Sequence, residues 1–138
     1  MKVFLDTNIL LDVLVEHDNK EFTENATTIL GLGSNRVLDL YMSVLSVTTI
    51  AYVLRNMTTV KKKGIIKDLV SIVKVLPSLP EHVENMLECQ MNDIEDAMQV
   101  QSATEGQCDV IVTRNTTDFR DAGLPVISPE EFLKKIIM

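Results

Sequence analysis

The sequence predicts an α/β fold, a three-layer α/β/α sandwich around a mostly parallel central sheet. Two short apolar runs, residues 3–5 and 109–113, have the continuous hydrophobicity of strands that are buried on both faces. Segments with helical spacing of apolar residues lie between them, and strands that alternate with helices favour parallel pairing. The 138 residues, 46% hydrophobic and 24% charged, indicate one globular domain over residues 1–138.

The first half of the chain is expected to contain two strands and three helices. Asn8 is placed to cap the first helix, because its side chain can accept a hydrogen bond from a backbone N–H of the first turn. Gly31 and Gly33 are expected to stop the second helix. The expected elements are a strand over residues 3–5, a helix over 9–15, a helix from 21 to 31, a strand over 37–42 and a helix over 44–54.

The second half is expected to contain four helices and two strands. Pro77 and Pro80 end the first of these helices, because proline cannot continue one. Near the end of the chain, Ser128 is the expected helix cap, Pro129 takes the first helical position and Glu131 completes a capping box. The expected elements are helices over residues 65–76, 83–87 and 94–100, strands over 109–113 and 125–128, and a helix after 128.

The net charge of −7 disfavours loose attraction to nucleic acid, which depends on basic surface. The charges are unevenly distributed, however, because residues 40–67 contain no Asp or Glu. A mostly acidic protein with one basic stretch can still bind a polyanion locally. The alternative is that the lysines between Lys61 and Lys67 form the solvated face of a helix. The candidate contacts to a polyanion are Arg36, Arg55, Lys61, Lys62 and Lys63.

Neither a membrane span nor an export signal is indicated. No apolar run approaches the roughly 18 residues that span a bilayer, and the N-terminus lacks the separate apolar segment and cleavage site of a signal peptide. Cys89 and Cys108 fit no metal-binding or redox spacing. His17 and His82 lie in polar stretches and are interpreted as surface residues. We therefore expect a cytoplasmic protein.

Polar side chains are expected to meet at one edge of the sheet. Asp6 follows the first strand directly, and open parallel sheets bind ligands outside the carboxyl ends of their strands. Asp93 and Asp96 are three residues apart and therefore share one face of a late helix. The polar residues that follow the strand at 109–113 are Thr113, Asn115 and Asp118.

Most of these residues also have a purely structural interpretation. Asn92 and Glu95 match a capping box, so Asp93 can be structural, and Asp118 can cap a turn. Asp96 lies beyond the cap, near the core-facing side of its helix. Together the acids would repel one another, and a divalent cation would relieve the repulsion. Carboxylate, amide and water oxygens suit Mg²⁺ or Mn²⁺.

Three stretches in this order and spacing, FLDTN, EDAMQVQSA and IVTRNTTDF, resemble the PIN domain family, which includes the VapC-type toxins of bacterial toxin–antitoxin pairs. Its members are typically Mg²⁺- or Mn²⁺-dependent ribonucleases. The resemblance implies an RNA substrate, and it names an antitoxin protein and a second copy of the chain as candidate partners. It implies that Asp6, Asp96 and Asp118 hold the metal and are catalytic together with Asn115. The residues implied to support them are Asn8 and Thr113.

The chain departs from the family pattern in the helix after the second strand. Family members usually carry another acid there, often a glutamate, and Thr49 stands at the corresponding position. A hydroxyl brings no charge, so we expect Thr49 to support the site only weakly and the metal affinity to be lower. Asp93 is a supporting residue that can fill the gap. Asp12 is a further candidate acid, although we favour a surface position for it.

Two functional hypotheses follow from this departure. The protein is a weakened ribonuclease, or it is a degenerate, non-catalytic PIN-like domain that binds RNA or a protein, for which seven methionines would provide an adaptable apolar surface. The interpretation that we favour for the methionines is core filling. A receiver or phosphatase-like domain also places an acid after its first strand, but it needs a lysine near a late strand end, where this chain has Arg114. Metal binding through Asp6 distinguishes the ribonuclease from the interaction module.

Overall fold

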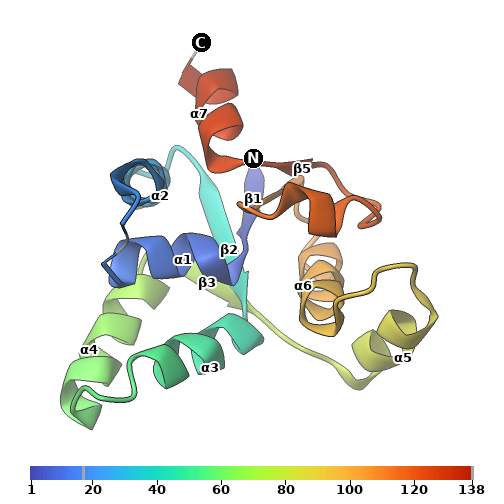
Figure 1. The fold of residues 1–138 in the computed structure, drawn as a ribbon, viewed down its shortest axis with the longest axis horizontal. Helices are drawn as coiled ribbons and strands as arrows, with labels where there is room; N and C mark the ends of the chain where they lie inside the picture. The colour runs from blue at the N-terminus through green and yellow to red at the C-terminus, as the bar shows by residue number, and fades with distance from the viewer. Residues whose placement is uncertain (17, 138) are drawn as a thin grey trace.

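A five-stranded parallel sheet forms the centre of the molecule (Figure 1). The computed structural model describes residues 1–16 and 18–137. The strand order is β3-β2-β1-β4-β5, and each neighbouring pair is parallel. The strands are β1 (Lys2–Leu5), β2 (Asp39–Ser43), β3 (Val73–Leu76), β4 (Val110–Val112) and β5 (Val126–Ile127).

Seven α-helices and one 3-10 helix connect or follow these strands in the described part of the chain. They are α1 (Thr7–Leu14), α2 (Lys20–Ser34), α3 (Val44–Val53), α4 (Thr59–Val70), α5 (Pro80–Glu88), α6 (Ile94–Glu105), η1 (Thr116–Phe119) and α7 (Pro129–Ile137).

Helices cover both faces of the sheet, as predicted. Successive side chains of β1 point to opposite faces: Val3 and Leu5 join a core formed with α1, α2, α3, α4 and α7, whereas Phe4 joins a smaller core with α6. Helix α5 packs against α6 (Figure 1). The three-layer α/β/α prediction is therefore confirmed, and both faces of the sheet are apolar because both are buried.

The sheet reverses its strand order between β1 and β4. The chain runs outward from β1 to β2 and β3, then returns to place β4 on the other side of β1, with Val3 opposite Val110 and Leu5 opposite Val112. Helices on opposite faces diverge at such a reversal and leave a crevice outside the carboxyl ends of the two strands. Directly after β1, the backbone N–H of Asp6 donates to the carbonyl of Val112 over 3.0 Å.

The predicted helix over residues 65–76 is wrong in its second half. Helix α4 already ends at Val70, and Val73–Leu76 forms β3, which pairs with β2 from Leu40 to Ser43. The apolar spacing of residues 65–73 fits a helix, but Val73 and Val75 are β-branched and pack well in a strand. Pairing with β2 decides the conformation, and a local pattern does not contain that information.

Two predicted helix boundaries in the first half also need correction. Asp6, not Asn8, caps α1, and its side chain accepts a hydrogen bond from the backbone N–H of Thr7. Helix α2 continues through both glycines to Ser34. A Cβ on Gly33 would lie 2.3 Å from the side chain of Leu40, so this glycine lets α2 approach β2 closely.

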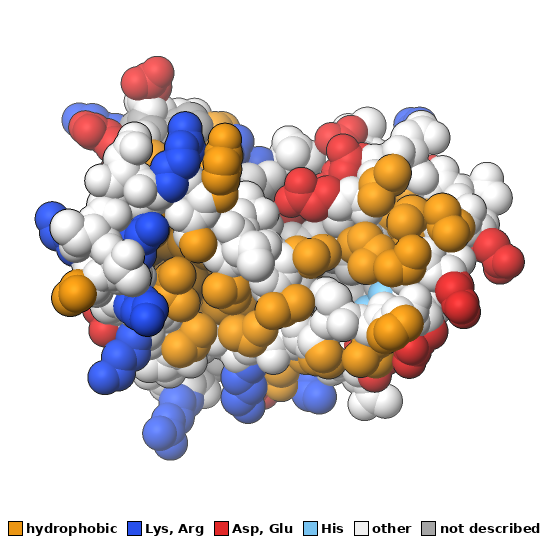
Figure 2. All heavy atoms as spheres, turned by 90° about the horizontal axis from the view of Figure 1, so that it is seen from below, with side chains coloured by type: hydrophobic (Ala, Val, Ile, Leu, Met, Phe, Trp, Pro, Cys, Tyr) orange, Lys and Arg blue, Asp and Glu red, His pale blue; other side chains and the backbone are white. Residues whose placement is uncertain are grey.

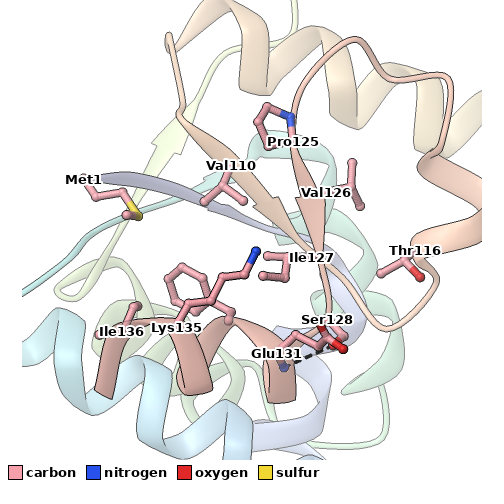
Figure 3. A pocket seen from close by; sticks show the side chains of 11 residues that line it. Met1, Val110, Thr116, Pro125, Val126, Ile127, Ser128, Glu131, Lys135 and Ile136 are labelled. Atoms are coloured by element: carbon pink, nitrogen blue, oxygen red, sulfur yellow. Dashed lines mark hydrogen bonds between the residues drawn. The ribbon is translucent and has the colours of Figure 1, made fainter. Parts of the chain in front are cut away.

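Helix α7 begins as predicted and covers a hollow. The Ser128 hydroxyl accepts a hydrogen bond from the backbone N–H of Glu131 over 3.2 Å, which confirms Ser128 as the cap (Figure 3). A pocket of about 560 Å³ lies between this helix and the edge of the sheet, and Val110, Ile127 and Phe132 are among its lining residues. The pocket contains none of the acids predicted for the functional site.

His82 is buried rather than on the surface, with 3% of its area exposed. Its Nδ1 accepts a hydrogen bond from the backbone N–H of Leu79, and its Nε2 lies 3.6 Å from a carboxylate oxygen of Glu105. The ring therefore caps the first turn of α5, a role that a polar neighbourhood in the sequence does not reveal. His17 lies outside the described residues. No helix within residues 1–16 and 18–137 has the length and apolarity to cross a bilayer.

Candidate active site

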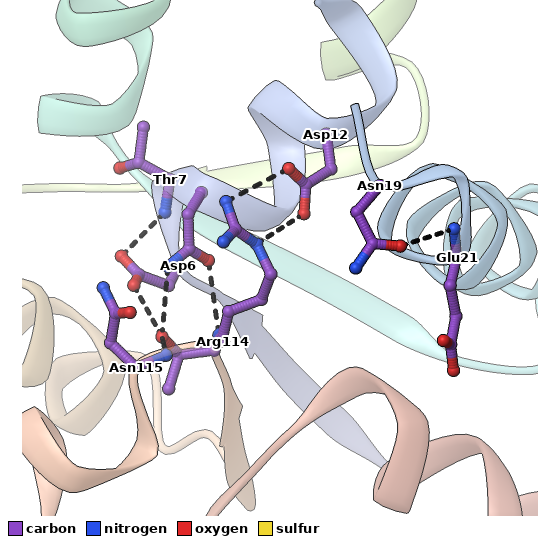
Figure 4. Close-up of polar contacts among 9 residues, drawn as sticks. Asp6, Thr7, Asp12, Asn19, Glu21, Arg114 and Asn115 are labelled. Carbon is purple, nitrogen blue, oxygen red and sulfur yellow. Dashed lines mark hydrogen bonds and ion pairs between the residues drawn. The ribbon is translucent and has the colours of Figure 1, made fainter. Parts of the chain in front are cut away.

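The candidate site lies where β1 and β4 end side by side. Asp6 follows β1 and Thr113 follows β4, and the parallel register of the two strands brings these side chains together. The Thr113 hydroxyl donates to one carboxylate oxygen of Asp6 over 2.8 Å. The backbone N–H of Thr7 donates to the other oxygen, also over 2.8 Å (Figure 4). The predicted meeting of polar groups at this edge is found for Asp6 and Thr113.

Asp6 is almost fully buried, with 5% of its area exposed. Burial raises the pKa of its carboxyl above the ordinary value, because a charge loses its hydration inside a protein. Hydrogen bonds from Thr113 and Thr7 act in the opposite direction, and so do contributions from Gln99 and the charge of Arg114. Asp6 is thus held in one orientation by hydrogen-bond donors that favour its charged form.

Helix α6 brings a second group of acids toward Asp6. Asp93 is its N-cap and accepts a hydrogen bond from the backbone N–H of Asp96 over 2.9 Å, so the predicted cap at Asn92 is wrong. The pKa of Asp96 is raised to about 7, first by burial and then by the negative charges of Asp6, Asp93, Asp118 and Glu95. Acids from separate parts of the sequence therefore act on one another electrostatically.

Glu95 belongs to this group, although its sequence pattern predicted only a capping role. Its pKa is raised by burial and by the charges of Asp6 and Asp93. The signal was present in the sequence, because Glu95 directly precedes Asp96. Because Glu95 also matches a capping box with Asn92, the sequence favoured a structural role for it. In the structure the N-cap is Asp93.

Asn115 and Asp118 lie on the exposed side of the site. The backbone N–H of Asn115 donates to the Thr113 hydroxyl over 3.1 Å, and the N–H of Asp118 donates to the Asn115 carbonyl over 3.0 Å. Phe119 is fully buried and anchors η1, so the chain turns at a fixed point while the two polar side chains remain exposed. Asp118 also lines a cleft of about 180 Å³ together with Asp93 and other residues of the two loops.

Asp12 is buried and paired, which contradicts the surface position favoured for it. Its carboxylate accepts from Arg114 Nε over 2.8 Å and from Arg114 Nη2 over 3.2 Å, and the guanidinium lies 4.5 Å from the ring centroid of Phe22. This pair fixes the start of the loop after β4 to α1. Asn8 lies beside it, with weak contacts of 3.5 Å to the Thr113 hydroxyl and to the backbone N–H of Arg114.

A model of the PIN domain matches residues 2–117. This chain belongs to the PIN domain family. Ribonuclease VapC1 of Aquifex aeolicus (strain VF5) is 29% identical to it over 140 residues, which cover 97% of this chain and 94% of that protein.

Two solved structures extend this relationship to the fold. FitAB bound to a DNA fragment has a TM-score of 0.69 at 17% identity, and the match covers 92% of this chain and 94% of that one. VapBC2 from Rickettsia felis, bound to a DNA fragment from its promoter, has a TM-score of 0.67 at 14% identity and covers 93% and 98%. At these identities the likeness concerns the fold.

In this PIN domain, Thr49 stands on the second helix that approaches the site. Its hydroxyl donates to the carbonyl of Leu45, one turn earlier in α3, over 3.1 Å, and its side chain is half-buried. The neighbouring Thr48 makes the same bond over 2.8 Å but is exposed. Helix α3 contains no acid, and the carboxylates that interact electrostatically with Asp6 include Glu95 and Asp96 of α6.

The basic residues are divided between the two ends of the sheet. Arg55 lies just after α3 with its guanidinium 4.4 Å from the ring centroid of Tyr52. The three lysines lie on the first turns of α4, where Lys61 and Lys63 are exposed and Lys62 is half-buried. Arg36 lies just before β2 begins, at the opposite edge of the sheet from Asp6. The structure thus separates Arg36 from the other candidate contacts, which are Arg55, Lys61, Lys62 and Lys63.

A divalent cation suits the chemistry of this site, although the acids are not gathered around one point. Within residues 1–16 and 18–137, no group of three or more His, Cys, Asp and Glu side chains stands close enough to hold a metal ion. The raised pKa of Asp96 nevertheless shows that the carboxylates lie within electrostatic reach. Arg114, the cation that acts on Asp6, is already paired with Asp12. The local excess of negative charge is what a hard cation with oxygen ligands would neutralise.

Proposed function

We propose that this PIN domain hydrolyses RNA phosphodiesters with Mg²⁺ or Mn²⁺ held by Asp6, Asp96 and Asp118. The observation that carries the proposal is the buried carboxylate of Asp6 at the carboxyl ends of β1 and β4. Asp96 lies within electrostatic reach of it, because burial and the negative charges of Asp6, Asp93, Asp118 and Glu95 raise the pKa of Asp96 to about 7. Proteins seldom crowd acids in this way without a functional reason. The relationship to ribonuclease VapC1 over nearly the whole chain supports RNA as the substrate.

Each residue has a role that its surroundings suggest. Asp6, fixed by two hydrogen bonds, would be the central ligand, with Asp96 and Asp118 completing the set from either side. A bound divalent cation lowers the pKa of water and neutralises charge on a phosphate. The exposed Asn115 amide would orient the scissile phosphate, because it can donate hydrogen bonds to an anion without adding negative charge. Thr113 would keep Asp6 charged and in place.

The test compares cleavage of a mixed panel of single-stranded RNAs by the wild type and by Asp6→Asn, with Mn²⁺, with Mg²⁺ and with a chelator. We expect cleavage that requires the metal and is lost in Asp6→Asn. The matched control is Asp109→Asn, since Asp109 lies at the other end of β4 and accepts from the backbone N–H of Lys2. Cleavage that survives in Asp6→Asn, or that is lost equally in Asp109→Asn, would contradict the proposed site.

A second candidate function is a non-catalytic PIN domain that binds RNA or a protein. Thr49 favours it, because α3 supplies no acid, and so does the lack of three gathered acids among the described residues. Calorimetry with Mn²⁺ separates the two functions. Binding that Asp6→Asn abolishes supports the ribonuclease, whereas the lack of any Asp6-dependent binding supports the interaction module.

We also propose an antitoxin as the protein partner and a homodimer as the assembly. The relatives FitAB and VapBC2 support the first, and an apolar surface around the candidate site supports both. Figure 2 shows this end of the molecule: hydrophobic side chains form a band, Lys and Arg gather on the left, and Asp and Glu lie mainly on the right. The exposed apolar residues of α3, α4, α5 and α6 include Tyr52, Val60, Leu87 and Ile94. Such surfaces commonly mark protein interfaces.

A further inference from the structure

The candidate site has a neutral, buried polar cluster behind its acids. Gln99 of α6 is completely buried, and so are Ser43 and Ser46. Its Nε2 donates to the Thr7 hydroxyl over 2.8 Å and to the Ser46 hydroxyl over 3.0 Å, while its Oε1 accepts from the Ser43 hydroxyl. An amide in such surroundings is stable only if its donors and acceptor are satisfied, and here all of them are.

The hydrogen-bond partners of Gln99 come from three elements, α1, β2 and α3. Thr7 begins α1 directly after Asp6, Ser43 ends β2, and Ser46 lies in the first turn of α3. The hydroxyls of Thr7 and Ser46 are also 2.7 Å apart, and the backbone N–H of Ser46 donates to Ser43. One side chain of α6 thus ties the ends of β1 and β2 together with the start of α3.

Gln99 is also one helical turn after Asp96, so both residues lie on the same side of α6. The hydrogen bonds of Gln99 to Thr7 and Ser46 fix the rotation of this turn about the helix axis and its position along that axis. Thr7, whose hydroxyl accepts one of these hydrogen bonds, also donates its backbone N–H to the Asp6 carboxylate. The chain of contacts from Asp96 to Asp6 therefore passes through rigid backbone and a buried amide.

We infer that Gln99 is a positioning residue, which sets the placement of Asp96 relative to Asp6 by fastening α6 to Thr7, Ser43 and Ser46. The inference rests on the proposed function for its catalytic meaning, but its geometric content can be tested without activity. In the absence of an acid on α3, the helix still contributes to the site through Ser46. Its contribution is to hold the acids of the opposite helix in place.

The test variant is Gln99→Met, which keeps the volume of the side chain and removes all of its hydrogen bonds. The matched control is Ser102→Ala, one turn later in the same helix. Ser102 is completely buried and donates to the carbonyl of Pro77 over 3.2 Å, away from Asp6. A milder second variant is Ser46→Ala, which removes one hydrogen-bond partner of Gln99. It keeps the bond from the backbone N–H of residue 46 to the Ser43 hydroxyl, which caps α3.

Amide hydrogen exchange, followed by NMR on folded protein, provides the readout that does not depend on metal or RNA. We expect the amides of Thr7 and Asp96 to exchange at least tenfold faster in Gln99→Met than in Ser102→Ala, and about threefold faster in Ser46→Ala. If Gln99→Met does not fold, the smaller change in Ser46→Ala decides the question. If the amides of Thr7 and Asp96 exchange no faster in Gln99→Met and Ser46→Ala than in Ser102→Ala, the inference is overturned.

Mn²⁺ binding and RNA cleavage then test the functional part. We expect Gln99→Met to lower both the Mn²⁺ affinity and the cleavage rate about tenfold, as the loss of an outer supporting residue does at other metal sites. Ser102→Ala should leave both within twofold, even where the two variants lower the melting temperature equally. A wild type that neither binds Mn²⁺ nor cleaves RNA refutes the proposed function, while the exchange experiment still decides the placement of Asp96.

Discussion

The two helices that approach Asp6 differ in what they bring to it. Helix α6 carries three acids in its cap and first turn, Asp93, Glu95 and Asp96. Burial raises the pKa of Asp96 to about 7, together with the negative charges of Asp6, Asp93, Asp118 and Glu95. Helix α3 approaches from the side of β2 with hydroxyl groups, Ser46 and Thr49, and no charge. A cation between them would be attracted from one side only. The comparison indicates that α6 supplies the charge and α3 supplies the scaffold.

The most severe change to this arrangement is Asp96→Asn. We expect Mn²⁺ affinity and RNA cleavage to fall by on the order of a hundredfold, because the variant removes a proposed ligand rather than a supporting group. Glu95→Gln should have an effect several times smaller, since the exposed Glu95 acts on the site by its charge alone. Calorimetry and initial cleavage rates measure both variants. Equal effects would mean that α6 contributes general negative potential and no specific ligand.

Adding a charge to α3 tests the other half of the comparison. Thr49→Glu should raise the Mn²⁺ affinity about tenfold, because it places a carboxylate on the side that lacks one. Thr48→Glu is the matched control, since Thr48 is the adjacent threonine and its hydroxyl donates to the same Leu45 carbonyl, but its side chain is exposed. If both variants raise the affinity equally, the gain comes from overall charge and Thr49 has no special place.

Helix α6 should make the stability of the protein depend on pH, because it carries Asp96. The pKa of Asp96 is about 7 in the folded protein against an ordinary value of 3.8, so the folded state binds this proton more tightly than the unfolded chain does. Stability from this proton is fully present below about pH 4 and is lost as the pH rises through about 7. Mn²⁺ affinity should rise over the same range.

Thermal unfolding without metal, between pH 4 and 8, checks this prediction. The melting temperature of the wild type should fall more steeply with pH than that of Asp96→Asn, which lacks the titrating group. Added Mn²⁺ should oppose the fall at high pH in the wild type. Parallel curves for the two proteins would show that Asp96 titrates normally.

The smallest expected effect concerns the lysines of α4, beyond the end of α3. Replacing Lys61, Lys62 and Lys63 with Gln should weaken RNA binding uniformly across sequences. The slope of log affinity against log salt should fall by up to about 2, at roughly 0.7 for each phosphate contact that is lost. Fluorescence anisotropy at several salt concentrations measures it, and an unchanged slope would remove these lysines from the RNA surface.

The centre of the fold and of the site could be predicted from the sequence, because they depend on local patterns. Two continuous apolar runs identify β1 and β4, and an acid directly after a buried strand points to the carboxyl edge of the sheet. The features that were missed depend on partners far away in the chain. The Asp12–Arg114 pair spans 102 positions, and β3 takes its conformation from β2.

Gln99 was missed for a related reason. In the sequence it is one polar residue in a helix of mixed character, and its three partners lie 53 to 92 positions away. Glu95 was missed because one local pattern, the capping box, has two equivalent readings one residue apart. The hydrogen bond from the backbone N–H of Asp96 to Asp93 decides between the two, and it depends on where the folded chain begins the helix.

The pairing of β1 with β4 has a consequence for the synthesis of the protein. Asp6 and Thr113 directly follow adjacent strands, yet 107 positions separate them, so β1 pairs with β4 only after the long segment between them has been synthesised. Contacts of such long range form late and slowly. A ribosome-bound fragment that ends before β4 lacks the Thr113 hydroxyl that donates to Asp6, and it lacks Asn115 and Asp118 as well. The candidate site is therefore assembled only after β4 and η1 have been synthesised, which separates the synthesis of β1 from the onset of any activity.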